Sequence, residues 1–291
     1  MTEPKKVLGV YAPGSNHWVG DGFPVRNLFP SSGVDKQIDP FLMLDYAGPA
    51  RFEPSREPRG VGEHPHRGFE TVTIAYQGAV DHRDSAGNSG TIRPGDVQWM
   101  TAASGIVHEE KHEREFTAQG GVFEVVQLWV NLPAAHKMSP PRYQGILSEQ
   151  IPVADLGAGA FARVIAGEFD GVKGPARTFT PVTLLDLRLS AGSRAELTVP
   201  AGQNSGLVLL RGDVVVNSSE ALTGEAKLAL LSPSGNSLSL EAKADSILLF
   251  LSGEPINEPV ASYGPFVMNT QAELRQAVDD YRAGKMGRLP G

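Results

Sequence analysis

Cysteine is absent from the 291 residues, which excludes disulfide frameworks, thiolate zinc sites and iron–sulfur clusters. No stretch approaches the roughly 18 consecutive apolar residues of a membrane span. The N-terminal residues also lack the long apolar core and small-residue cleavage site of a secretory signal. We therefore expect a cytoplasmic protein that does not bind a membrane.

Basic residues are in the minority, because 26 Lys and Arg stand against 33 Asp and Glu, with a net charge of −7. Direct nucleic-acid binding needs a basic face, so we expect none. The hydrophobic fraction of 41% and charged fraction of 20% are typical of a soluble globular protein. The 33 glycines and 22 prolines favour many turns between short strands.

Histidine is missing from the second half, since all seven histidines lie at or before His136. His64 and His66 stand at i and i+2 in a β-type context, so both project from the same face of a strand. His108 and Glu110 repeat this spacing. If the two strands pair, three imidazoles and one carboxylate converge on a mononuclear metal site. Such a set suits Fe, Mn, Ni, Cu or Zn and is too rich in nitrogen for Ca or Mg.

The remaining histidines have blander interpretations. His82, between two aspartates, is expected to be solvated at a hairpin turn. His112 could be a fifth ligand, but its charged flanks favour an exposed loop. His17 and His136 are expected at the surface.

The pattern of apolar and turn residues predicts an all-β fold with two strand-rich blocks. Prolines interrupt the connector between the blocks. Thr270 and Glu273 form a capping box that predicts a C-terminal helix at about 271–283. The predicted organisation is an N-terminal metal-binding domain, a linker, and a C-terminal metal-free domain that carries the helix, at residues 1–135, 136–160 and 161–291. Alignment of the two halves places Glu241 of the second domain opposite Glu110, with no imidazole beside it.

Five segments resemble the signature of the pirin family of bicupins, at residues 64–72, 94–102, 105–110, 128–132 and 264–270. The resemblance implies two tandem cupin (jelly-roll β-barrel) domains with a short C-terminal helix. It also implies one Fe(II) per chain, held by His64, His66, His108 and Glu110, with Ni, Cu, Mn or Zn as possible substitutes. Glu70 stands where many cupins place a ligand, and the proline of the general cupin motif is missing before Gly105.

The resemblance further implies quercetin 2,3-dioxygenase activity on a small aromatic substrate such as a flavonol. Glu110 would then also act as the catalytic base. The alternative is a redox-responsive regulator that binds a metabolic enzyme or transcription factor without turnover. We expect a monomer. Seven side chains could support or line the site, although barrel core is the more common role for the apolar ones: Glu70, Arg67, Phe69, Trp99, Met100, Phe123 and Leu128.

Overall fold

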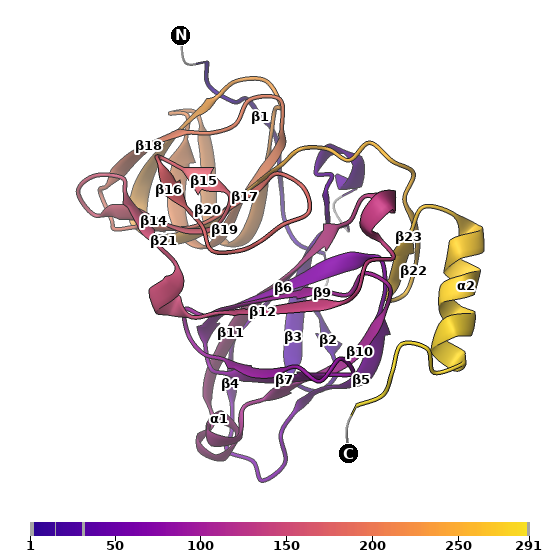
Figure 1. Ribbon diagram of the computed structural model, residues 1–291. Helices are drawn as coiled ribbons and strands as arrows, with labels where there is room; N and C mark the ends of the chain where they lie inside the picture. Colours follow the sequence, from indigo (N-terminus) through magenta and orange to yellow (C-terminus); the bar gives the residue numbers. More distant parts are fainter. Residues whose placement is uncertain (1–2, 15, 31–32, 290–291) are drawn as a thin grey trace. The chain divides into compact units, whose positions relative to one another are not determined.

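The computed structural model describes residues 3–14, 16–30 and 33–289. The chain forms two compact units, and each contains a β-barrel (Figure 1). The unit called here the first barrel consists of residues 15–26, 42–148 and 256–291, and the second barrel consists of residues 1–14, 27–41 and 149–255. No helix in the described ranges combines the length and the apolar character that a membrane crossing needs.

The first barrel is built from two sheets. Its strands are β2 (Asn16–Val19), β3 (Phe23–Phe29), β4 (Phe41–Phe52), β5 (Gly60–His66), β6 (Phe69–Gln77), β7 (Val80–Asp84), β8 (Ser89–Ile92), β9 (Val97–Thr101), β10 (Ile106–His112), β11 (Gly121–Asn131) and β12 (Arg142–Ile146). One sheet has the order β12-β9-β6-β11-β4-β3-β2 and the other β5-β10-β7-β8. A short helix α1 (Arg114–Gln119) and the 3-10 turns Ala134–His136 and Ser148–Gln150 follow the ends of strands. β3 and β4 each contain a point where the chain passes between the units.

The second barrel has an apolar interior. Its strands are β1 (Val7–Tyr11), β13 (Val153–Asp155), β14 (Ala160–Ala166), β15 (Glu168–Phe169), β16 (Val172–Lys173), β17 (Val182–Leu189), β18 (Arg194–Thr198), β19 (Asn204–Val216), β20 (Glu220–Leu231) and β21 (Ser237–Gly253), with a 3-10 turn at Asp35–Gln37. The main sheet has the order β1-β20-β19-β21-β17-β14-β13, and β18 also pairs with β21. Leucine, valine, alanine and phenylalanine side chains from these strands form one buried cluster.

The C-terminal segment holds β22 (Ala261–Tyr263), β23 (Phe266–Met268) and helix α2 (Gln271–Arg282), drawn in yellow in Figure 1. The predicted capping box is confirmed: the Glu273 backbone N–H donates to Thr270 Oγ1 at 3.2 Å. The helix stops before Gly284, which has a φ of +73° and adopts the left-handed conformation common after helices.

The units differ from the domain boundaries that the sequence suggested. Residues 256–291 belong to the first barrel, because the apolar face of α2 packs against Val107 of β10 and against β23. Residues 1–14 belong to the second barrel, because β1 pairs with β20. The predicted linker 136–160 contains β12, which pairs with β9, and β13, which pairs with β14. Its prolines lie outside these strands, with Pro140 and Pro141 before β12 and Pro152 before β13.

Candidate metal centre

Two neighbouring strands of the first barrel bring three imidazoles together. β10 runs antiparallel to β5, with His108 opposite His64 and Ile106 opposite His66. One ring nitrogen from each of His64, His66 and His108 lies within 4.8 Å of the others. The ring centroids are 4.2 Å apart for His64 and His108 and 4.9 Å apart for His66 and His108. The pairing of the two histidine-bearing strands is as the sequence predicts.

The hydrogen bonds of these rings leave their Nε2 atoms for a cation. Nδ1 of His64 lies 2.7 Å from the Gly62 carbonyl oxygen, and Nδ1 of His66 lies 3.4 Å from that of Pro265. Nδ1 of His108 is also engaged, whereas its buried Nε2 has no hydrogen-bond partner among the described residues. Ligating histidines commonly use the second ring nitrogen in this way. Burial holds the pKa of both His66 and His108 well below 6.5, so these rings are neutral, as metal binding requires.

Glu110 lies on the same face of β10 as His108 and is surrounded by donors. Gln98 donates an amide N–H to its Oε1 at 3.1 Å, and Gln127 donates to its Oε2 at 3.2 Å. The Thr73 hydroxyl lies 3.2 Å from Oε1. These hydrogen bonds hold both carboxylate oxygens of Glu110 in place.

A second group of three possible ligands shares His108 with the first. One ligand atom each from His82, His108 and Glu110 lies within 4.8 Å of the others. The structure thus brings all four predicted ligands to one region, and it adds His82, which the sequence reasoning placed elsewhere.

The expectation that His82 is solvated is wrong. β7 alternates inward and outward, so Val80, His82 and Asp84 are buried while the residues between them face outward. His82 lies opposite Glu110 on β10, and Asp84 lies opposite His108. Burial acts to raise the pKa of Asp84, but hydrogen bonds from His82 and Asn88 outweigh it and hold that pKa below its ordinary value. The same i, i+2 spacing that identified the ligand pairs could have identified His82 and Asp84.

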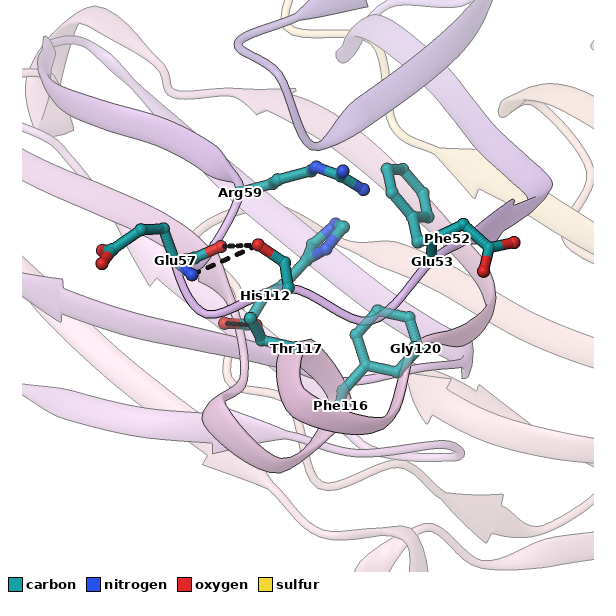
Figure 2. A pocket seen from close by; sticks show the side chains of 9 residues that line it. Phe52, Glu53, Glu57, Arg59, His112, Phe116, Thr117 and Gly120 are labelled. Atoms are coloured by element: carbon teal, nitrogen blue, oxygen red, sulfur yellow. Dashed lines mark hydrogen bonds between the residues drawn. The ribbon is translucent and has the colours of Figure 1, made fainter.

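The expectation that His112 lies in an exposed loop is also wrong. His112 is the buried last residue of β10, and its Nε2 lies 2.9 Å from the Gly22 carbonyl oxygen. Its ring centroid is 4.4 Å from that of Phe123 and 4.6 Å from that of Phe52. Figure 2 shows it among the side chains that line a pocket. The pocket has a volume of about 10 Å³, enough for one water molecule. His112 therefore belongs to an aromatic cluster instead of the metal centre.

The apolar side chains divide between the two faces of the large sheet. Phe69 lies beside the centre, with its ring 5.1 Å from that of His66. Met100 pairs with Thr71 on that same face, whereas Trp99 and Leu128 lie opposite Val72 on the other face. Phe123 packs around His112, as described above. Only Phe69 and Met100 of the predicted apolar lining therefore face the centre.

Trp129 is a lining residue that the sequence reasoning missed. Its half-buried ring lies 5.3 Å from His66 and 4.2 Å from Phe69. The signal was present, because Trp129 and Leu128 are neighbours on one strand and must face opposite sides of the sheet. Gln98, Gln127 and Thr73 are not among the predicted site residues for a different reason. A polar residue inside a barrel can be recognised only from the side chains that it contacts.

Glu70 and Arg67 have partners other than the three imidazoles. Glu70 is buried, and it accepts a hydrogen bond from Thr101 Oγ1 at 2.7 Å, with Arg142 at 3.7 Å. Burial raises its pKa to about 7, against the smaller lowering effects of Thr101 and Arg142. Arg67 pairs with Asp280 of α2 at 2.9 Å and also donates to the Ser104 carbonyl oxygen at 2.7 Å. Glu70 therefore pairs with Arg142, and Arg67 pairs with Asp280.

In the second barrel Glu241 lies at the surface, where it pairs with Arg194 at 3.4 Å and with Lys243. The interior positions carry aliphatic side chains such as Leu187, Leu209 and Leu248. These side chains offer no atoms that bind a cation.

Comparison with known proteins finds matches to segments of both barrels. The Pirin family model matches residues 22–130, and the Pirin C-terminal cupin domain model matches residues 184–287. The chain is 53% identical over 283 residues to a Pseudomonas aeruginosa protein named "Putative quercetin 2,3-dioxygenase PA2418", covering 97% of this chain and 98% of that one. It is 40% identical over 256 residues to human Pirin, covering 87% and 84%. The crystal structure of a quercetin 2,3-dioxygenase from Acinetobacter baumannii matches with a TM-score of 0.95 and 52% identity, covering 98% and 99%.

Proposed function

Because this chain belongs to the pirin family, we propose that it is a metal-dependent oxygenase of the quercetin 2,3-dioxygenase type. The observation that carries the proposal is the meeting of the three imidazoles, among which the buried Nε2 of His108 has no hydrogen-bond partner in the described chain. The names of the relatives from Pseudomonas aeruginosa and Acinetobacter baumannii support the choice of reaction.

We assign one Fe(II) ion to His64, His66, His108 and Glu110. The donor set fits, because neutral imidazoles with one carboxylate suit Fe(II) and also Mn, Ni, Cu or Zn. Four protein ligands would leave room on the ion for other molecules. The bound ion would supply Lewis acidity and a template for a flavonol and dioxygen.

The side chains around the centre would bind and orient a flat aromatic substrate. The rings of Phe69 and Trp129 make edge contacts with His66, and the half-buried Trp129 would contact an aromatic ligand beside it. Met100, fully buried on the same face, excludes water from that wall. His64, Gln127 and Trp129 are half-buried, so we expect a substrate to enter past their side chains.

Glu110 has two tasks in this proposal. Its amide donors Gln98 and Gln127 hold the carboxylate in place as a ligand. One of its oxygens would also accept the proton of the flavonol 3-hydroxyl when the substrate binds as its anion. A Glu110→Gln protein that keeps its metal and the full rate of ring opening would show that this proton goes elsewhere.

The proposal is tested by loading the protein with Fe(II), adding quercetin in air and following the loss of flavonol absorbance and the release of carbon monoxide. We expect turnover in the wild-type protein and in the exposed control His17→Ala, and loss of turnover in His64→Ala. Metal-loaded protein without turnover would contradict the proposal. Together with a protein partner captured only after oxidation of the metal, that result would favour the regulatory alternative.

A further inference from the structure

A buried chain of polar side chains leads from the metal centre into the four-stranded sheet. Nδ1 of His108 lies 3.3 Å from Nδ1 of His82, and Nε2 of His82 lies 3.2 Å from Oδ2 of Asp84. The side chains of His82 and Asp84 are both 0% exposed. We propose that Asp84 and His82 are positioning residues that fix the tautomer and the ring orientation of His108, so that its Nε2 lone pair faces the metal. This inference rests on the metal site of the proposed function.

A single arrangement of protons satisfies all the hydrogen bonds that link His108, His82 and Asp84. An ionised carboxylate can only accept, so the Nε2 of His82 carries the proton that it donates to Asp84. The Nδ1 of a neutral His82 is then bare and accepts from the Nδ1–H of His108. The Nε2 of His108 is consequently bare as well, and this is the buried atom that lacks a hydrogen-bond partner among the described residues. The inferred tautomer is therefore the one that metal binding requires.

Hydrogen bonds hold the Asp84 carboxylate in an orientation that determines which nitrogens of His82 and His108 carry protons. Its Oδ1 accepts the backbone N–H groups of Ala86 at 2.9 Å and Asn88 at 3.0 Å. The Asn88 side chain donates to both carboxylate oxygens, at 3.1 and 3.0 Å. Oδ2 is thus directed at His82, while Oδ1 is occupied by the tight turn that follows β7.

The ring plane of His82 is fixed from the other side. The Tyr143 ring stacks on it with centroids 4.9 Å apart and an interplanar angle of 19°. Tyr143 reaches this position because β12 pairs with β9, which places it opposite Met100 on the inner face of the sheet. The Asp84 carboxylate and the Tyr143 ring therefore hold His82 in one orientation. A residue that positions His108 needs such a fixed orientation.

His82 could instead bind the metal itself, since it forms a group with His108 and Glu110. The hydrogen bonds argue against this. Both of its nitrogens are engaged, one with Asp84 and one with His108. Turning Nε2 to a cation would break the hydrogen bond to Asp84, and turning Nδ1 to it would remove the acceptor of His108.

Three substitutions separate these roles. In Asp84→Asn the amide oxygen should remain on the backbone N–H groups of residues 86 and 88, so the NH₂ group would face His82 and reverse both tautomers. His82→Phe keeps a ring against Tyr143 but removes the acceptor for His108. His82→Gln restores an acceptor oxygen toward His108 and an N–H toward Asp84. The matched control is His17→Gln, an exposed residue of the same barrel.

Metal affinity is measured by titrating metal-free protein with Co(II) and following its d–d absorbance. Outer partners of ligating histidines typically contribute about 10- to 100-fold in affinity. We expect losses of this size in Asp84→Asn and His82→Phe, with substantial recovery in His82→Gln and none lost in the control. If His82→Gln loses as much affinity as His82→Phe, His82 is itself a ligand and the proposal is wrong.

The tautomers are read from long-range ¹H–¹⁵N correlation spectra of the metal-free protein. We expect the proton of His108 on Nδ1 in the wild type and on Nε2 in Asp84→Asn. The opposite tautomer in the wild type overturns the proposal even if a variant fails to fold. Unchanged Co(II) affinity in folded Asp84→Asn, with binding abolished in His64→Ala, rejects the positioning role while the metal site stands. If the wild type binds no Co(II), the metal site fails instead, and the spectra still report the hydrogen-bonded chain.

Discussion

The buried carboxyl of Glu70 should make the stability of the first barrel depend on pH. Its pKa is raised from 4.5 to about 7, mainly by burial. Below pH 4.5 the carboxyl is protonated in both the folded and the unfolded states. Between pH 4.5 and 7 only the folded state keeps the proton, so the free energy of unfolding falls as pH rises. Above pH 7 the folded state carries the full cost of burying the ionised carboxylate. The difference in pKa corresponds to about 3 kcal/mol.

Glu70→Gln isolates this contribution. Glutamine keeps an oxygen that can accept the Thr101 hydrogen bond but cannot ionise. We expect the variant and the wild type to be similar in stability near pH 4.5, and the variant to be more stable by about 3 kcal/mol at pH 8. The lowered pKa of His66 and His108 acts in the opposite direction, because it reduces stability as pH falls below 6.5. That effect is common to both proteins and cancels in their difference.

Urea unfolding followed by tryptophan fluorescence is suited to this measurement. The three tryptophans, Trp18, Trp99 and Trp129, all lie in the first barrel, so the signal reports that unit. The control is Glu53→Gln, which removes an exposed carboxylate and should leave the pH profile unchanged. Parallel stability curves for wild type and Glu70→Gln from pH 4.5 to 8 would refute the reasoning.

Three further predictions use the same unfolding assay. Asp280→Ala leaves the buried guanidinium of Arg67 without its carboxylate and should cost about 3 kcal/mol; an unchanged midpoint would show that water replaces the pair. Gly68→Ala places a Cβ 1.9 Å from the Val267 carbonyl oxygen, whereas Gly87→Ala has a similar positive φ and open space, so equal losses in the two variants would exclude the steric explanation. Removal of metal by a chelator should lower stability by about 2.7 kcal/mol relative to protein in metal at 100 times the dissociation constant; no change would contradict specific binding to the folded state.

The sequence was most informative where local spacing determines geometry. The two i, i+2 pairs, which begin at His64 and at His108, meet if their strands are antiparallel neighbours. β5 and β10 are such neighbours. The capping box at Thr270 likewise depends on four consecutive residues. The same rule of alternation applies to β7, where the aspartates near His82 suggest exposure to solvent although Asp84 is its buried partner.

Long-range docking could not be predicted from spacing. Arg67 and Asp280 are 213 residues apart in the chain, and their contact assigns the C-terminal segment to the first barrel. Nothing in the helix pattern of α2 specifies which barrel its apolar face covers. The Pro265 carbonyl oxygen beside His66 comes from this same segment. The residues around His66 in the sequence therefore give no indication of this distant partner.

The two barrels show why ligands alone do not make a metal site. In the second barrel, Leu209 and Leu248 lie directly opposite each other on β19 and β21, in the antiparallel relation that His64 and His108 have in the first. Histidines placed there would meet, but they would be surrounded by the aliphatic side chains of the core. Each ring would keep an unsatisfied nitrogen, which costs about 1–3 kcal/mol when buried. In the first barrel, by contrast, carbonyl oxygens, amides and a second histidine engage the ligand atoms that face away from the centre. The capacity to hold a cation therefore depends on the polar interior around the ligands as much as on the ligands.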